Sequence, residues 1–303
     1  FNECVGISGA LLDILGKLDK AVDVVISGHT HRAYNCRIDG RLVTSAHQYG
    51  TVVSDIDLVL DPKTRDVMSA VANNVIVRTA SFAKEPRMTA LIDQYEKLVV
   101  PLARRVVGRT TAPLPRDYAP NGESVLGQVI ADAQLAATRD AGAEIAFMNP
   151  GGIRAALPLP PDGQVRYEDL FSIQPFSNNL VTMTLTGAQI VQLLEQQWIG
   201  RSGPTGTMLQ VSRGFSYSWD AARPVGQRVV PGSVMLAGQP LRLDASYRVT
   251  VNSFLAGGGD NFVVLKEGKS AVTGLMDIDA LELHVKNNPT LSPGALDRIV
   301  RVN

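Results

Sequence analysis

The sequence predicts an α+β protein built as two units joined by a helix. The chain has 303 residues, which is long for a single hydrophobic core. Residues 1–83 carry helix and strand patterns typical of the end of an α/β sheet domain, whereas residues 107–303 mix strands and helices irregularly, as α+β domains do. The stretch between them, 84–106, has a helical pattern, so we expect a linker helix there.

The first unit opens with a short helix followed by strands. Apolar residues at helical spacing in 8–18 place leucines on one face and predict a helix. The segment Asp61-Pro62-Lys63-Thr64 is a turn signal, because Pro presets the bend and Asp bonds its own backbone. The segments with strand patterns are 22–26, 41–45, 51–60 and 68–77.

The linker and the second unit begin with clear helix signals. Pro86 suits a first helical turn, and apolar residues then recur every three or four positions up to Val106. Ser124 is expected to cap a helix that ends before Gly142, and Thr186 with Gln189 forms a capping-box pattern. The remaining predicted elements are strands at 144–148, 214–219, 229–236, 247–252 and 299–302, and helices at 186–198 and 277–286.

Composition excludes two classes of partner. Lys plus Arg equals Asp plus Glu, so no net field attracts a nucleic acid polymer or an anionic membrane. No apolar run approaches the roughly 20 residues that span a bilayer. The chain starts at Phe1 without a Met, so we expect it to be a piece of a longer, N-terminally extended protein.

Two cysteines, Cys4 and Cys36, leave two alternatives. They are either two free buried thiols or one disulfide formed in an oxidising compartment. Both are expected in irregular segments near the histidine turn described next, which favours the disulfide. A disulfide would indicate an extracytoplasmic protein, that is, one that is periplasmic, secreted or on the cell surface.

A candidate metal site follows the apolar run that ends at Ile26. His29 and His31 stand one residue apart, and we expect a sharp turn at Gly28 to aim both rings at one point. Neutral imidazole is a common ligand for zinc and manganese. The alternative is that the two histidines make local hydrogen bonds in a loop. His47 lies one strand later and is either a second group near this site or an exposed loop residue.

Three further motifs suggest a ligand site in the second unit. The segment 149–154, NPGGIR, joins two glycines to Arg154, whose guanidinium suits carboxylate or phosphate. The segment 174–179 holds Phe176, and the segment 252–262 holds Phe254, three glycines and Asp260. Two phenylalanines can stack on a planar base, and a carboxylate can accept the hydroxyls of a ribose. Taken singly, each motif also fits a surface turn or plain core packing.

Taken in series, these motifs resemble a known pair of domains. The strand followed by G-H-x-H resembles the last metal-binding motif of the metallophosphoesterase superfamily. The three later motifs, N-x-G-G-I-R, P-F and N-x-F-L-x-x-G-G-D-x-F, are similar in kind and order to those of the 5′-nucleotidase C-terminal domain. The resemblance implies the end of a metallophosphoesterase α/β sandwich at 1–83, a linker helix at 84–106 and a nucleotide-binding domain at 107–303.

The resemblance also implies roles for individual residues. His29 and His31 would each bind a different ion of a dinuclear centre holding two divalent metal ions, zinc or manganese. In the second unit the implied substrate-binding residues are Asn149 and Arg154 (Arg154 on the phosphate side), the base-stacking pair Phe176 and Phe254, and the ribose-binding Asp260.

Two departures qualify this resemblance. The sequence contains no D-x-H and no G-N-H, so the other metal ligands and the catalytic residues are expected upstream of Phe1. Some family members also carry a phosphate-binding Arg just before the helix at 124, where this sequence reads Asn121-Gly122-Glu123. The site in this chain is therefore expected to be incomplete on its metal side and different in its phosphate contacts.

The implied parent is a metal-dependent phosphohydrolase that releases phosphate from nucleoside 5′-monophosphates. Its C-terminal domain would bind the nucleoside and swing about the linker helix. Within the same class, the alternatives are a 2′,3′-cyclic phosphodiesterase with 3′-nucleotidase activity and a nucleotide-sugar hydrolase. Outside it, the alternatives are a catalytically idle nucleoside-binding module and a secreted interaction protein.

Overall fold

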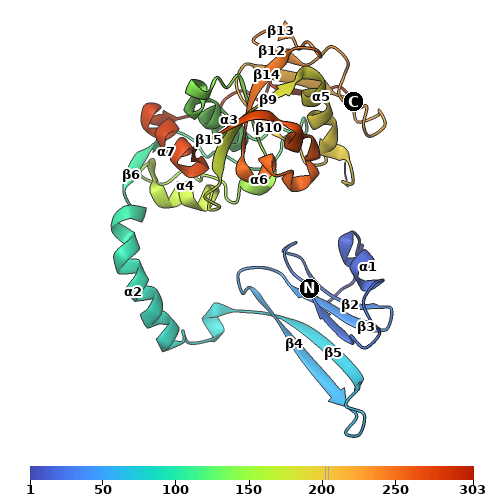
Figure 1. Cartoon of the computed structure of the whole chain (residues 1–303). Helices are drawn as coiled ribbons and strands as arrows, with labels where there is room; N and C mark the ends of the chain where they lie inside the picture. The colour runs from blue at the N-terminus through green and yellow to red at the C-terminus, as the bar shows by residue number, and fades with distance from the viewer. Residues whose placement is uncertain (202, 204) are drawn as a thin grey trace. The chain divides into compact units, whose positions relative to one another are not determined.

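The chain forms two compact units, residues 1–93 and 94–303, in a computed structural model that describes residues 1–201, 203 and 205–303 (Figure 1). The mixed α+β class predicted from the sequence is confirmed. The division between the units falls inside helix α2, Pro86–Ala103. The finer boundaries expected at residues 83/84 and 106/107 stay a prediction.

The N-terminal unit contains one small sheet and one long hairpin. The sheet has the order β1-β3-β2, with β1 parallel and β2 antiparallel to β3, and the hairpin pairs β4 with β5. The elements of this unit are α1 Ala10–Leu15, β1 Val24–Ile26, β2 Ala33–Ile38, β3 Arg41–Ala46, β4 Val52–Leu60, β5 Val67–Ile76 and a 3₁₀ turn at Thr79–Ser81.

Two expectations for this unit were wrong in detail. The first helix is shorter than 8–18, because Gly9 precedes it at φ 85° and Gly16 caps its end. Cys36 lies in strand β2, paired with Val43, and not in an irregular segment. The strand is formed by its pairing with β3, which the local sequence does not reveal.

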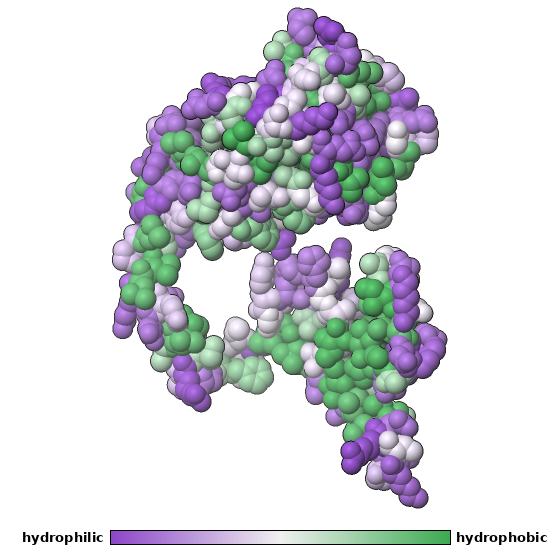
Figure 2. Space-filling view, in the orientation of Figure 1, coloured by the Kyte–Doolittle hydropathy of each residue, from purple (hydrophilic) through white to green (hydrophobic). Residues whose placement is uncertain are grey.

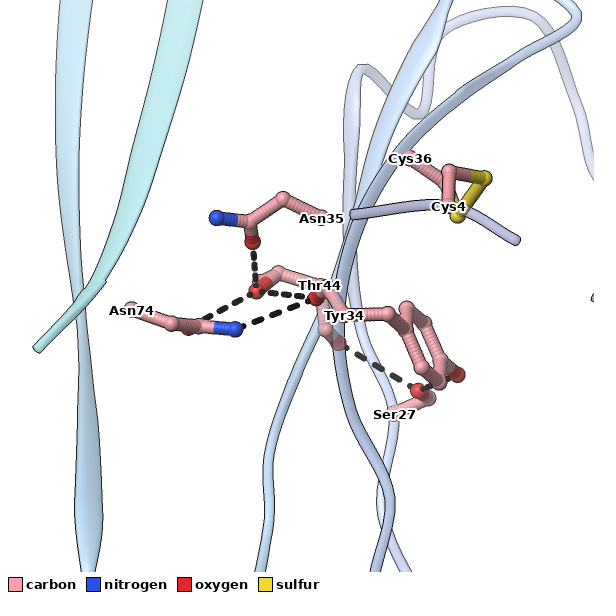
Figure 3. Close-up of a disulfide and its surroundings, with 7 residues drawn as sticks. All are labelled: Cys4, Ser27, Tyr34, Asn35, Cys36, Thr44 and Asn74. Carbon is pink, nitrogen blue, oxygen red and sulfur yellow. Dashed lines mark hydrogen bonds between the residues drawn. A yellow bond between two sulfur atoms is a disulfide. The ribbon is translucent and has the colours of Figure 1, made fainter. Parts of the chain in front are cut away.

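A disulfide and a polar network hold this unit together (Figure 3). Cys4 is bonded to Cys36, so the disulfide prediction is confirmed. Asn74 of β5 is 4% exposed, and its amide donates to the carbonyl oxygens of Ser45 at 3.0 Å and Tyr34 at 3.2 Å. Its side-chain oxygen accepts from the hydroxyl groups of Ser54 and Thr44. These bonds tie the hairpin to the sheet.

The hydrophobic cluster of this unit is small. It consists of Leu15, Cys36 and Val43, with partly buried residues packed around them. Many large apolar side chains on the hairpin are exposed instead, and Figure 2 shows a broad apolar area over the N-terminal unit. The exposed apolar residues of β4 and β5 are Val53, Leu58, Val59, Leu60, Met68, Val71, Val75 and Ile76.

The linker helix α2 forms as its pattern predicts. All 18 of its residues are described and none is buried, so its apolar stripe is exposed. Pro101 lies in the last turn, and the helix ends two residues later. Nowhere in the described chain is a helix long and apolar enough to cross a membrane.

A five-stranded sheet forms the centre of the C-terminal unit, in the order β10-β7-β14-β9-β15 (Figure 1). A four-stranded sheet, β13-β12-β11-β17, and a three-stranded sheet, β16-β6-β8, accompany it. The strands are β6 Val106–Thr110, β7 Ile145–Met148, β8 Gln164–Arg166, β9 Asn179–Thr186, β10 Gln210–Val211, β11 Phe215–Trp219, β12 Met235–Leu236, β13 Gln239–Pro240, β14 Ser246–Asn252, β15 Lys269–Met276, β16 Thr290–Leu291 and β17 Ile299–Arg301. The helices are α3 Val125–Ala137, α4 Tyr167–Ile173, α5 Gly187–Glu195, α6 Ser253–Ala256 and α7 Asp277–Asn287, with short 3₁₀ turns at Arg139–Ala141, Pro150–Gly152, Gln196–Trp198, Gly259–Asn261 and Val263–Glu267.

Strand β7 explains why this unit has two hydrophobic cores. Successive side chains of a strand point to opposite faces of its sheet. Ile145 and Phe147 belong to one buried cluster, together with Trp198 and Trp219, while Met148 belongs to the other. The second cluster packs side chains of α3, α4 and α7. A strand that is buried on both faces reads as a continuous apolar run, as this one does.

Local signals in this unit were confirmed where a cap or a turn decides the structure. The Ser124 hydroxyl accepts from the Gly127 N–H, and Thr186 with Gln189 forms the predicted capping box. The strand expected at 229–236 was wrong, because only Met235–Leu236 pairs with β11 as a strand. Pro231 lacks an N–H and Gly232 has φ 74°, so the chain turns there.

Candidate functional site

The histidine turn follows strand β1, as expected, but its geometry differs from the expectation. The left-handed conformations fall on His29 at φ 67° and His31 at φ 57°, and not on Gly28. Histidine is among the residues that enter this region more readily than most, at a modest cost. Just before the turn, Ser27 is fixed to β3 because its N–H donates to the Thr44 carbonyl at 2.8 Å.

The described residues do not form a complete metal site. No cluster of three or more His, Cys, Asp or Glu side chains with ligating geometry is present among them. Two imidazoles alone fall short of the three or four protein ligands that hold a catalytic or structural zinc. Among the described residues, His29 and His31 therefore do not complete a metal site, and their role as ligands stays a prediction.

His47 has local partners. Its Nδ1 is 2.8 Å from the Thr51 hydroxyl, and its ring packs edge-on against Phe1 at 6.2 Å between centroids. His31 instead lies 5.9 Å from the Tyr49 ring. These contacts hold the partly buried His47 in a turn beside its own neighbours, and its place near a metal site stays a prediction.

In the C-terminal unit, the structure brings Asn149 and Asp260 together from motifs 111 residues apart. The Asn149 amide donates to Asp260 Oδ2 at 2.7 Å, and its carbonyl oxygen accepts from Asn252 Nδ2 at 2.9 Å. Asn149 and Asn252 are almost fully buried, whereas Asp260 is partly exposed. The two asparagines thus fix one oxygen of a carboxylate at the surface of the unit.

Strand geometry explains this meeting point. Asn149 follows the end of β7 and Asn252 is the last residue of β14, which runs parallel to β7. The carboxyl ends of parallel strands meet at one edge of a sheet. Gly152 gives these side chains room, since a Cβ at this position would lie 2.4 Å from Met148 Cε and 3.0 Å from Asn149 Oδ1.

Arg154 and Phe176 form a second pair. The Arg154 guanidinium carbon lies 5.6 Å from the centre of the Phe176 ring, within cation–π range. The Arg154 N–H donates to the Ile173 carbonyl at 2.8 Å, so the NPGGIR turn and the end of α4 are bonded directly. Phe176 is 52% exposed, which is high for a large aromatic side chain.

Phe254 lies on the Gly-rich loop that carries Asp260. A Cβ on Gly259 would come within 2.5 Å of the Phe254 ring, so glycine lets the backbone pass against the ring face. Phe254 is 49% exposed. Asp260 itself has φ 52°, which directs its side chain from a tight turn. No aromatic contact joins Phe254 to Phe176 in the described part of the chain.

Three residues of this region escaped the sequence prediction. Asn252 belongs to the Gly-rich motif, but its bond to Asn149 depends on the register of β14 beside β7. Arg201 donates to the Asp260 carbonyl at 2.7 Å, and Arg116 donates to the Arg154 carbonyl at 2.6 Å. Neither arginine stands in a motif, so no signal in the sequence marks them.

Electrostatics around the site involve a buried phenol. Burial raises the pKa of Tyr118 well above its ordinary value, and the nearby charges of Tyr217 and Asp260 add to this. Tyr118 is therefore neutral at physiological pH, and its hydroxyl donates to the Met208 carbonyl at 2.9 Å. It packs against the large hydrophobic core of the unit as an uncharged group.

Comparison with known proteins finds relatives that match most of this chain. Endonuclease YhcR of Bacillus subtilis is 31% identical over 93% of this chain, which corresponds to 22% of that protein. Cell wall protein Lmo0130 of Listeria monocytogenes is 29% identical over 82% of this chain and 33% of its own length. The chain thus spans between about a fifth and a third of the length of these relatives.

A solved structure agrees over nearly the whole chain. The 5′-nucleotidase precursor of Thermus thermophilus matches with a TM-score of 0.72 and 31% identity, over 93% of this chain and 60% of that one. The model of the 5′-nucleotidase C-terminal domain matches residues 106–267, which contain the described site. The chain belongs to the 5′-nucleotidase C-terminal domain family.

Proposed function

We propose that the C-terminal unit binds the nucleoside part of a nucleotide, within a parent protein that releases phosphate from nucleoside 5′-monophosphates. Membership of the 5′-nucleotidase C-terminal domain family supports the substrate class. The observation that carries the proposal is the Asn252–Asn149–Asp260 chain of hydrogen bonds. It fixes a carboxylate at the surface, on the same Gly-rich loop as the half-exposed Phe254 ring.

Asp260 is suited to the hydroxyls of a ribose. Asn149 occupies one of its oxygens, and no hydrogen bond to Asp260 Oδ1 is present among the described residues. An ionised carboxylate accepts at both oxygens, so lone pairs are left for the 2′- and 3′-hydroxyl donors. The buried asparagines hold the carboxylate in one orientation before any ligand arrives, which reduces the ordering cost of binding.

Phe176 and Phe254 are suited to the base. Each exposes about half of a large apolar surface to water, and stacking on a base would cover it. Such stacking contributes roughly 1–3 kcal/mol per base. Arg154, beside Phe176, would lie on the phosphate side, where its guanidinium can donate two parallel hydrogen bonds.

The parent is also proposed to use two divalent metal ions, with His29 and His31 as two of the ligands. The described chain does not complete that site, so this chain by itself is proposed to bind rather than to hydrolyse. We further propose an extracytoplasmic location, which is supported by the Cys4–Cys36 disulfide and by the resemblance to a cell wall protein.

Binding of adenosine to the 303-residue chain tests this proposal, measured by titration calorimetry. The unmodified chain is expected to bind adenosine, and Phe254→Ala or Asp260→Ala is expected to weaken binding about tenfold or more. Phe171→Ala is the matched control, because Phe171 is 48% exposed on α4 and belongs to none of the motifs. Equal losses in the control and in Phe254→Ala would contradict the assignment.

A phosphodiester substrate is the second candidate, and it is favoured by one observation. The Bacillus relative at 31% identity is named an endonuclease. A substrate panel distinguishes the monophosphate candidate from the phosphodiester candidate. The full-length parent, with zinc or manganese, is given a nucleoside 5′-monophosphate, a 2′,3′-cyclic nucleotide, a nucleotide sugar and a short oligonucleotide. Preferred cleavage of a diester would replace the monophosphate assignment and leave the nucleoside site intact.

A further inference from the structure

A cavity of about 400 Å³ lies in the C-terminal unit between α3, α7 and the segment that follows β16. Its charged lining residues are Asp132, Arg139, Arg213 and Arg298, and His284 contributes an imidazole. None of the five residues assigned to the nucleoside lines it. Ligand pockets range from roughly 300 to 1,000 Å³, so this cavity is large enough for a small molecule.

The cavity lies at the opposite end of the central sheet from Asp260. Strand β10 runs antiparallel to β7, with Gln210 beside Met148 and Val211 beside Phe147. Arg213 therefore lies where β7 begins, whereas Asn149 follows the point where β7 ends. Four strand residues separate the two places by roughly 13 Å along the sheet, at about 3.3 Å per residue.

The single carboxylate among the described lining residues is already neutralised. Arg298 donates to both oxygens of Asp132, at 2.8 and 2.9 Å, and the backbone N–H of Arg213 donates to Oδ1 at 2.6 Å. Both side chains of the ion pair are at most 15% exposed. A paired and buried carboxylate of this kind neither repels an anion strongly nor attracts a cation.

Two guanidinium groups, those of Arg139 and Arg213, have no hydrogen bond to a carboxylate of the described chain. The Arg213 side chain is 85% exposed, and its closest acid is Asp132, 3.8 Å from Nε, beyond hydrogen-bond distance. Arg139 is exposed, and its side chain has no hydrogen bond or ion pair among the described residues. Because the charges of Arg298 and Asp132 cancel, the lining of the cavity carries a net charge of about +2, from Arg139 and Arg213.

His284 adds an uncharged hydrogen-bonding group to this wall. Burial lowers the pKa of His284, and the Arg213 guanidinium lowers it as well, against an opposing effect of Asp132. At neutral pH the ring is therefore neutral and offers one donor and one acceptor. No hydrogen bond to this ring is present in the described part of the chain, so its N–H is available to donate a hydrogen bond to a bound molecule.

We propose that this cavity binds a phosphate group, either inorganic phosphate or the phosphate of a small metabolite, between Arg139 and Arg213. Two guanidinium forks match the charge of a phosphate dianion and the directions of its oxygens. A carboxylate carries one charge and would leave one fork unused. This site is separate from the nucleoside site and does not depend on its assignment.

Phosphate titration of the 303-residue chain tests the proposal, by calorimetry in a buffer of low ionic strength. The double variant Arg139→Ala/Arg213→Ala is expected to weaken phosphate binding at least tenfold. The control is Arg78→Ala/Arg87→Ala, which removes the same charge from exposed positions near α2. Control and Phe254→Ala chains are expected to bind phosphate like the unmodified chain.

A second measurement locates the bound phosphate. The chain has four histidines, so the ring signals of His284 can be followed by NMR as phosphate is added. They are expected to shift and saturate, and a nucleoside monophosphate that shifts them where the nucleoside does not would identify a metabolite phosphate as a ligand. Absence of phosphate binding, a loss of equal size in the control variant, equal binding of acetate, or saturation without any shift at His284 would each overturn the proposal.

Discussion

The N-terminal unit gathers Leu15, Cys36 and Val43 into its buried cluster, whereas the C-terminal unit packs two clusters that include Trp198, Trp219 and Phe147. The smaller cluster is supplemented by the Cys4–Cys36 disulfide and by hydrogen bonds to buried Asn74. Small cores need such additions, because buried apolar area is the dominant favourable term in folding.

The candidate sites follow the same division. Asp260 is held by asparagines buried against the large core, so its position is fixed by closely packed neighbours. His29 and His31 lie in a left-handed loop of the small unit, and the described chain provides no third ligand. The residues that orient Asp260 lie in the well-packed unit, whereas metal binding by His29 and His31 stays a prediction.

Breaking the disulfide should produce the largest difference in stability between the two units. Replacing both Cys4 and Cys36 by serine opens a loop with a sequence separation of 32, which corresponds to about 3–4 kcal/mol on the chain-entropy model. Amide hydrogen exchange is expected to accelerate in β2 and β3 while β7 and β14 stay protected. Equal acceleration of exchange in both units would show that they unfold together and would contradict the view that the N-terminal unit depends more on its disulfide.

Removing the Asn74 side chain should have a smaller effect on the same unit. Asn74→Ala leaves buried partners on Ser45, Tyr34 and Ser54 without their bonds, and we expect a loss of about 2 kcal/mol. Asn73→Ala is the matched control, because Asn73 is exposed and is expected to change stability by less than about 0.5 kcal/mol. Denaturant unfolding measures both, and equal effects would mean that the buried network contributes little.

Sequence patterns predicted the elements whose formation is decided locally. The capping box at Thr186, the helix α2 and the buried strand β7 each carry a complete local signal. Strand β9 does not, because Thr182 alternates with apolar residues yet is buried. Its hydroxyl pairs with that of Thr250 at 2.8 Å, and a polar residue satisfied in this way cannot be told from an exposed one in a single sequence.

In the candidate site, too, the residues that depend on long-range contacts could not be predicted from the sequence. Its five motif residues could be named because glycines and aromatics in a fixed order mark them, whereas Arg201 and the role of Asn252 depend on long-range contacts. The phosphate cavity was not predicted at all, since its arginines follow α3, follow β10 and precede β17, and only the tertiary packing brings these segments together. Roles of the motif residues stay predictions until nucleoside binding is measured.

The smallest expected effect on stability concerns the end of the linker helix α2. Arg105, two residues beyond α2, donates two hydrogen bonds to Glu282 of α7, and its guanidinium lies 4.4 Å from the centre of the Tyr167 ring. The hydrogen bond from Arg105 and a smaller effect of Lys286 together lower the pKa of Glu282 to about 2, against the opposing effect of burial. The helix therefore leaves the C-terminal unit from a fixed point.

Because the folded-state pKa of Glu282 is lowered, its contribution to stability is fully present above about pH 4.5 and is lost as the pH falls towards 2. Arg105 is one-third exposed, so solvent screens the pair, and we expect Glu282→Gln to cost about 1–2 kcal/mol at pH 7. The cost should shrink as the pH falls below about 4.5 and vanish below about pH 2, where the unmodified residue is itself protonated. Lys286→Ala, which removes the exposed partner of Glu282, is the control and should change stability by about 0.5 kcal/mol or less. A cost that stays constant from pH 7 to pH 2 in thermal unfolding would show that Glu282 acts through packing, and that the helix is not anchored by charge.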